Sequence, residues 1–80
     1  KDITLLGNNN ISVTINELNN KINGNQGNNT VIFTGDSSEY LIDTFDNITS
    51  VTDKVSNRDG INILQSIEKL KFANQTIELN

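Results

Sequence analysis

The stretch KINGNQGNNTVIF (residues 21–33) places two short apolar runs on either side of a turn rich in glycine and asparagine. Glycine and asparagine tolerate the backbone conformations that tight turns need. Isoleucine, valine and threonine favour strands because their branched side chains fit a pleated surface. The stretch therefore predicts two strands joined by a compact turn, and the same pattern extends in both directions along the chain.

The first part of the chain repeats this strand-and-turn unit. Apolar runs recur at residues 3–6, 11–15, 18–22 and 30–33, separated by clusters rich in asparagine and glycine. Units with a spacing of roughly 7 to 12 residues are too short for a hairpin sandwich, but each can bury its apolar residues against the next one. We therefore predict a mainly β chain that begins with eroded parallel β-roll or β-helix coils.

The second part of the chain has a different pattern. The runs EYLIDTF and ITSVTD (residues 39–45 and 48–53) and the end LKFANQTIEL (residues 70–79) predict antiparallel hairpins. Between them, Ile63, Ile67 and Leu70 have helical spacing and predict one short helical turn near residues 63–68. We thus expect one small module over residues 1–80, with degenerate β-roll coils in 1–35 and an antiparallel capping segment in 36–80, as part of a larger protein.

Composition argues against several classes of function. The 80 residues contain no cysteine and no histidine, which removes thiolate chemistry and the commonest general base. The formal net charge is −4 and the lysines are scattered, so nucleic acid is not an expected partner. No apolar run approaches the roughly 20 residues of a membrane span. We expect a protein that is not an enzyme and does not span a membrane.

Residues 24–32, GNQGNNTVI, follow the nonapeptide G-G-x-G-x-D-x-U-x, in which U is a large apolar residue. Gly24, Gly27 and Val31 match the pattern, whereas Asn25 replaces the second glycine and Asn29 replaces the aspartate. The glycines allow the backbone to turn so that carbonyl oxygens converge, and calcium prefers carbonyl and carboxylate oxygens. The turn is thus retained and the charged ligand is missing.

The segment after this nonapeptide resembles the module that closes the repeat array in RTX-type secreted bacterial proteins. The residues that match are Phe33, Gly35, Tyr40, Ile42, Val51, Asp53, Asp59, Gly60, Leu64, Ile67, Glu68, Leu70, Phe72 and Ala73. The resemblance covers residues 24–79. It implies a non-catalytic structural cap of a secreted or cell-surface bacterial protein, with export through a type I system, calcium-assisted folding and neighbouring repeats of the parent chain as partners.

The residues that could take part in calcium binding are Gly24, Gly27, Asn29 and Asp59. Asp59 precedes Gly60, so we interpret it first as a turn residue and second as a ligand. In the resembling modules aspartate stands where this chain has Asn29, Asn62 and Asn74. Because ligand charge is a main determinant of calcium affinity, we expect calcium binding to be weak or lost.

Two other functions remain open at this point. The chain could be a binding module for surface carbohydrate, or it could associate with itself through an exposed edge strand. Sugar binding would favour exposed aromatic side chains, and we expect the aromatic residues to fill the core instead; these are Phe33, Tyr40, Phe45 and Phe72. Self-association would require an exposed apolar edge, which the sequence alone does not reveal.

Overall fold

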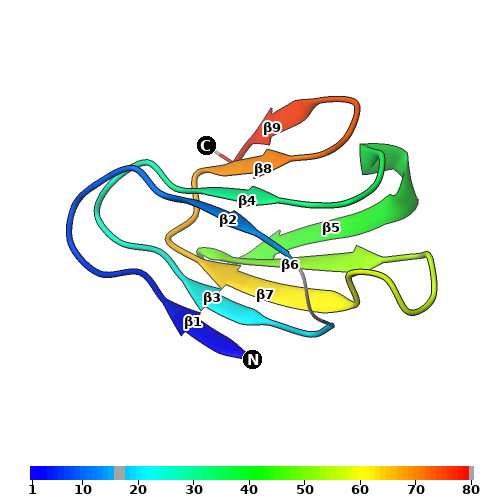
Figure 1. Ribbon diagram of the computed structural model, residues 1–80, viewed down its shortest axis with the longest axis horizontal. Helices are drawn as coiled ribbons and strands as arrows, with labels where there is room; N and C mark the ends of the chain where they lie inside the picture. The colour runs from blue at the N-terminus through cyan, green and yellow to red at the C-terminus, as the bar shows by residue number, and fades with distance from the viewer. Residues whose placement is uncertain (16–17, 80) are drawn as a thin grey trace.

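The computed structural model describes residues 1–15 and 18–79, and it confirms that the chain is mainly β (Figure 1). The described part contains nine strands and a single turn of 3-10 helix, η1 (Ser37–Glu39). The strands are β1 (Asp2–Thr4), β2 (Ser12–Thr14), β3 (Lys21–Asn23), β4 (Thr30–Ile32), β5 (Tyr40–Phe45), β6 (Ile48–Asp53), β7 (Ile61–Gln65), β8 (Lys69–Lys71) and β9 (Thr76–Glu78).

The strands form two mixed sheets, with the orders β1-β3-β7-β6-β5 and β2-β4-β8-β9. Strands β1 to β4 alternate between the two sheets in chain order, so each turn carries the chain from one sheet to the other. Within the sheets, β1, β3 and β7 are parallel neighbours, as are β2, β4 and β8. Figure 1 shows the turns that follow β1 and β3 lying side by side at one end of the molecule.

The core lies between the two sheets and consists of stacked apolar side chains. The register aligns Ile3 with Ile22 and Leu64 in one sheet. It aligns Val13 with Val31 and Leu70 in the other. The inner members, Ile22, Val31, Leu64 and Leu70, are at most 1% exposed. Ile3 and Val13 are only half-buried, because no described strand covers β1 or β2 on its outer side.

Two hairpins complete the sheets. The β5–β6 hairpin turns through Asp46 and Asn47, whose φ angles of 53° and 65° are those of a type I′ turn. The β8–β9 hairpin is also confirmed, with a register of Lys71 against Thr76. Its connection spans residues 72–75, and the Phe72 N–H bonds to the Gln75 carbonyl at 2.8 Å. Neither Asn74 nor Gln75 has a positive φ, so this turn is unstrained.

Two expectations about the second part of the chain are wrong. The predicted helical turn at residues 63–68 is β7 up to Gln65, followed by Ser66 with a φ of 59°. The helical spacing is overruled because a strand here completes the ladder with β3. Moreover, residues 36–80 are not an entirely antiparallel segment, because β7 and β8 extend the two parallel ladders.

Three of the four aromatic side chains form a buried cluster, as predicted. Phe33 packs against Tyr40 and Phe72 with ring centroids 5.3 and 5.1 Å apart. The prediction is wrong for Phe45, which is 85% exposed at the outward-facing end of β5.

In the residues described, no helix has the length and apolar character needed to cross a membrane.

Candidate functional site

The turn between β3 and β4 is held between two neighbouring turns. On one side, the Asn25 side-chain amide donates to the Asn9 carbonyl at 3.0 Å, and the Asn28 N–H donates to Asn10 Oδ1 at 2.7 Å. On the other side, the Asn29 N–H donates to Glu68 Oε1 at 2.6 Å. Glu68 therefore caps a backbone donor.

Gly24 and Gly27 are needed here for a reason that differs from the one expected. Neither glycine has a positive φ, so the turn does not rely on their conformational freedom. A Cβ atom on Gly24 would lie 2.0 Å from the Ser66 carbonyl oxygen, and one on Gly27 would lie 2.5 Å from the Asn9 carbonyl oxygen. The glycines allow successive turns to approach each other at backbone contact distance.

Asn29 is fully buried at the centre of this stack, with 0% exposure. Its Nδ2 donates to the carbonyl oxygens of Gly27 at 3.0 Å and Asn25 at 3.2 Å. Two further oxygens, the Ser66 carbonyl and Glu68 Oε1, each lie 3.5 Å away. The amide nitrogen thus occupies a space lined by four oxygens from two turns. The side-chain carbonyl, Oδ1, is buried without a hydrogen-bond partner in the described structure.

This arrangement does not fit a bound calcium ion. Calcium takes six to eight oxygen ligands, whereas the four oxygens around Asn29 converge on an N–H donor and include only one carboxylate oxygen. Among the described residues, no group of three or more acidic, histidine or cysteine side chains is placed to hold a metal. Gly24, Gly27 and Asn29 lie in one turn, and the Asn29 amide nitrogen occupies its centre.

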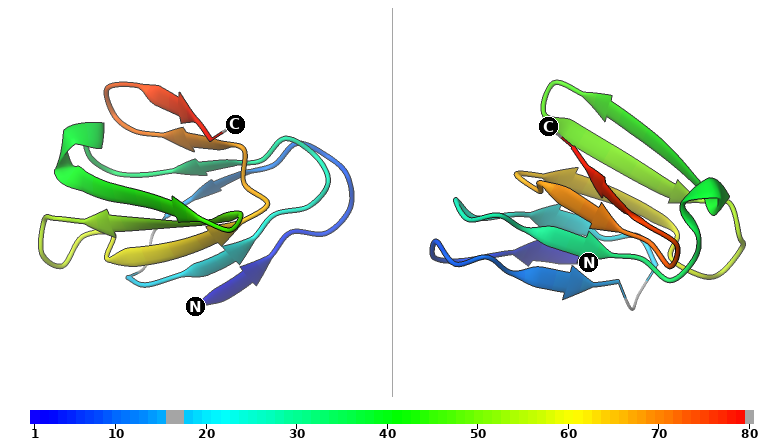
Figure 2. Two further views of the ribbon diagram at one scale, coloured as in Figure 1. Left: turned by 180° about the vertical axis from the view of Figure 1, so that it is seen from behind. Right: turned by 90° about the horizontal axis from the view of Figure 1, so that it is seen from above.

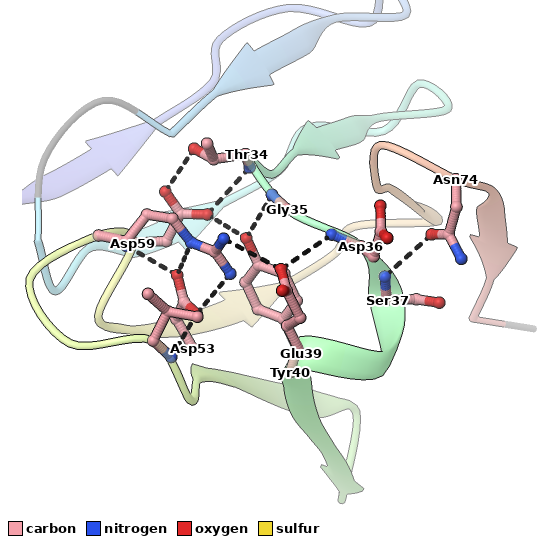
Figure 3. A network of polar contacts seen from close by, with 11 residues as sticks. Thr34, Gly35, Asp36, Ser37, Glu39, Tyr40, Asp53, Asp59 and Asn74 are labelled. Atoms are coloured by element: carbon pink, nitrogen blue, oxygen red, sulfur yellow. Dashed lines mark hydrogen bonds and ion pairs between the residues drawn. The ribbon is translucent and has the colours of Figure 1, made fainter.

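Asp59, the fourth predicted metal residue, belongs to a separate cluster (Figure 3). Its carboxylate accepts hydrogen bonds from the Thr34 N–H at 3.0 Å, the Thr34 hydroxyl at 2.8 Å and the Tyr40 hydroxyl. Asp59 is 2% exposed, and Gly60 follows it with a φ of +72°. Asp59 therefore fixes β4, β5 and the loop before β7 to one another.

Asp53 is the second buried carboxylate of this cluster and its main cation partner is Arg58. Asp53 accepts hydrogen bonds from Arg58 Nε at 2.7 Å and Nη2 at 2.8 Å. It also accepts bonds from the Val55 and Asp59 N–H groups at 2.9 and 3.0 Å. Burial opposes ionisation, but the bonds from Arg58 and the backbone outweigh it and hold the pKa of Asp53 below its ordinary value. In the sequence, Asp53 stands out only as one of the residues shared with the resembling modules, and nothing there identifies it as the partner of Arg58.

Asn29, Asn62 and Asn74, which stand where the resembling modules have aspartate, each form hydrogen bonds through the side-chain amide. Asn62 is fully buried, accepts from the Asn20 side chain at 2.9 Å and donates to the Asp59 carbonyl at 3.0 Å. Asn74 accepts from the Ser37 N–H at 2.9 Å. A carboxylate has no donor to replace the Nδ2 bonds of Asn29 and Asn62. At these two positions the amide is therefore required by the hydrogen-bonding pattern.

Tyr40 makes the stability of the cluster dependent on alkaline pH. Burial and the hydrogen bond to Asp59 raise the pKa of Tyr40 to about 12, although the Gly35 N–H bond opposes the shift. Between pH 10 and about 12 the unfolded chain loses the phenol proton while the folded chain keeps it. The stabilisation is thus complete below pH 10 and is lost as the pH rises through this interval. We expect the free energy of unfolding to fall by roughly 2 kcal/mol, measured by urea denaturation at successive pH values.

The control for this prediction is Tyr40→Phe, which removes the phenol and keeps the ring. Its free energy of unfolding should be lower at neutral pH and should fall less steeply above pH 10. Equal alkaline slopes for the two proteins would contradict the prediction.

Comparisons with models of protein families, with curated proteins and with solved structures give no match to this chain. The two polar clusters fix turns and strands to one another, and each includes several hydrogen bonds between a side chain and the backbone.

Proposed function

We propose that this chain is a non-catalytic structural module that closes a stack of parallel coils in a longer protein, and that it has lost calcium binding. The observation that carries the proposal is the position of the Asn29 amide nitrogen, which lies among oxygens of the type that calcium prefers. An internal N–H donor there performs the linking role of a cation. The turns are thereby held together without a metal.

The difference between the two ends of the sheets supports a capping role. At one end β1 and β2 have no described neighbour on their outer side, and at the other end β7 is covered by β6 and β5, and β8 by β9. The antiparallel strands end the two parallel ladders at β7 and β8, as a terminal unit of a repeat array does, although β5 and β9 are themselves edge strands. We infer that β1 and β2 pair with a preceding coil of the parent chain, and that β1–β4, β7 and β8 are coils of a β-roll.

Location and export are proposed on the resemblance alone. The resemblance to RTX-type closing modules favours a secreted or cell-surface bacterial protein exported through a type I system. The alternative of a carbohydrate-binding module has less support, because Phe45 is the one aromatic ring exposed in the described structure. A sugar platform usually needs an accessible ring beside several polar groups.

The proposal predicts that Asn29→Asp creates a calcium response. The substitution replaces the N–H donor by a second carboxylate next to Glu68. In the presence of a calcium chelator the variant should therefore be less stable than the unsubstituted protein. Millimolar calcium should then raise the midpoint of thermal unfolding by roughly 10 °C, equivalent to about 2.7 kcal/mol at 100 times the dissociation constant. The unsubstituted protein should show the same midpoint with calcium and with chelator.

Asn28→Asp is the matched control, because it adds the same charge to the same turn at an exposed position. It should show no calcium response. If calcium raises the midpoint of thermal unfolding of the unsubstituted protein, the proposed loss of calcium binding is wrong. An Asn29→Asp variant that responds no more than Asn28→Asp would show that the oxygens around Asn29 do not form a latent cation site.

A further inference from the structure

Strand β5 is a free sheet edge. It pairs with β6 on one side and has no described strand on the other (Figure 2). The Lys54 N–H bonds to the Glu39 carbonyl, and inward and outward backbone groups alternate along an antiparallel strand. The N–H and C=O groups of Tyr40, Ile42 and Thr44 therefore point away from β6. The Tyr40 N–H already bonds to the Ser37 carbonyl of η1, so the outward groups of Ile42 and Thr44 form the free hydrogen-bonding ladder.

The outer face of β5 carries an apolar–acidic–apolar pattern. Leu41 is 59% exposed and Phe45 is 85% exposed, and Asp43 lies between them on the same face. Ile48, opposite Phe45 on β6, is 41% exposed and adds to the apolar surface. A shallow groove runs over this face, lined by Asp43, Thr44, Phe45, Ile48 and Ser50. Within the described structure Asp43 forms no ion pair.

We propose that β5 binds an extended peptide of a partner protein that carries an apolar–basic–apolar alternation. The peptide adds a strand to the sheet through the outward groups of Ile42 and Thr44. Its basic side chain lies opposite Asp43, and its apolar side chains cover Leu41 and Phe45. Main-chain hydrogen bonds supply the affinity, and the alternating side chains supply the selectivity.

A second copy of the chain fits this edge less well than a basic peptide. Symmetric antiparallel pairing of β5 with itself has two registers that match the outward groups over about five residues. One register sets Asp43 directly against Asp43 of the second copy, and the other places the two carboxylates on neighbouring diagonal positions. Like charges at these positions destabilise a strand pair. The charge pattern therefore favours a partner with a basic residue at the centre.

The test is an NMR titration of the protein with the capped peptide Thr-Val-Thr-Lys-Thr-Val-Thr. The peptide reads the same in both directions, so it presents Lys opposite Asp43 whichever way it binds. Its control is the same peptide with Glu in place of Lys. We expect the Lys peptide to shift the β5 amide resonances and to bind about tenfold more tightly than the Glu peptide.

Two variants separate the charge from the backbone ladder. Asp43→Lys should reverse the preference between the peptides, because it changes the charge and keeps the edge. Thr44→Pro should abolish binding of both, because it removes an outward N–H while proline remains tolerated on an edge strand. Unchanged β7 and β8 resonances would verify that each variant is folded.

Three results would overturn the proposal. Equal binding of the two peptides would mean that Asp43 does not select a basic residue. Changes at β5 that depend on protein concentration in the absence of peptide would identify a second copy as the occupant. No shift at β5 with millimolar Lys peptide would mean that the edge does not accept a strand.

Discussion

Asp53→Ala is expected to lower the free energy of unfolding by about 3 kcal/mol or more, because it leaves Arg58 without its main anion in a largely buried cluster. It also leaves the Val55 and Asp59 N–H groups without their acceptor. For a chain of 80 residues this is a large part of a total stability on the order of 5 to 10 kcal/mol. Urea denaturation followed by circular dichroism measures the change.

Glu39→Ala is the control for this prediction. Glu39 is the second carboxylate bound to Arg58, at 3.0 Å, but its side chain is 43% exposed. An exposed ion pair contributes up to about 1 kcal/mol. The loss from Asp53→Ala should therefore be several times larger. Similar losses for the two variants would mean that burial of Asp53 does not determine the strength of the cluster.

Gly24→Ala is expected to destabilise the protein by about 3 kcal/mol or more, since its Cβ would lie 2.0 Å from the Ser66 carbonyl oxygen. That contact is with backbone, so no side-chain rotation can relieve it. Relief requires the turns to separate, which would break the bond from the Gly24 N–H to the Gln65 carbonyl and displace the oxygens around Asn29. Thermal and urea unfolding would both record the loss.

Gly7→Ala provides the comparison, because Gly7 has a φ of +83° and a Cβ atom added there would have no neighbouring atom within 4 Å. Only the backbone conformation is penalised there, at about 1 kcal/mol. A loss at Gly24 no greater than at Gly7 would contradict the interpretation that close approach of the turns requires glycine.

The candidate site could be predicted in part. Gly24, Gly27 and Asn29 lie within one turn, so their proximity follows from local spacing, and the structure brings them together. The sequence places Asp59 in the same candidate calcium site. In the structure Asp59 accepts hydrogen bonds from Thr34 and Tyr40 in a separate cluster. Its place depends on the path of the chain between β6 and β7, over which local spacing has no control.

Composition and alternation by themselves determined that this chain is mainly β, where most of its short strands lie, and that it has neither thiol nor imidazole for catalysis. These are local properties, because turn and strand preferences act over a few residues. Tertiary structure alone decided that residues 61–65 form a strand, that Phe45 faces outward and that the Asn29 nitrogen lies among four oxygens. Each of these depends on which distant segments pair, and hydrogen bonds between strands outweigh the weak local preference of a short apolar run.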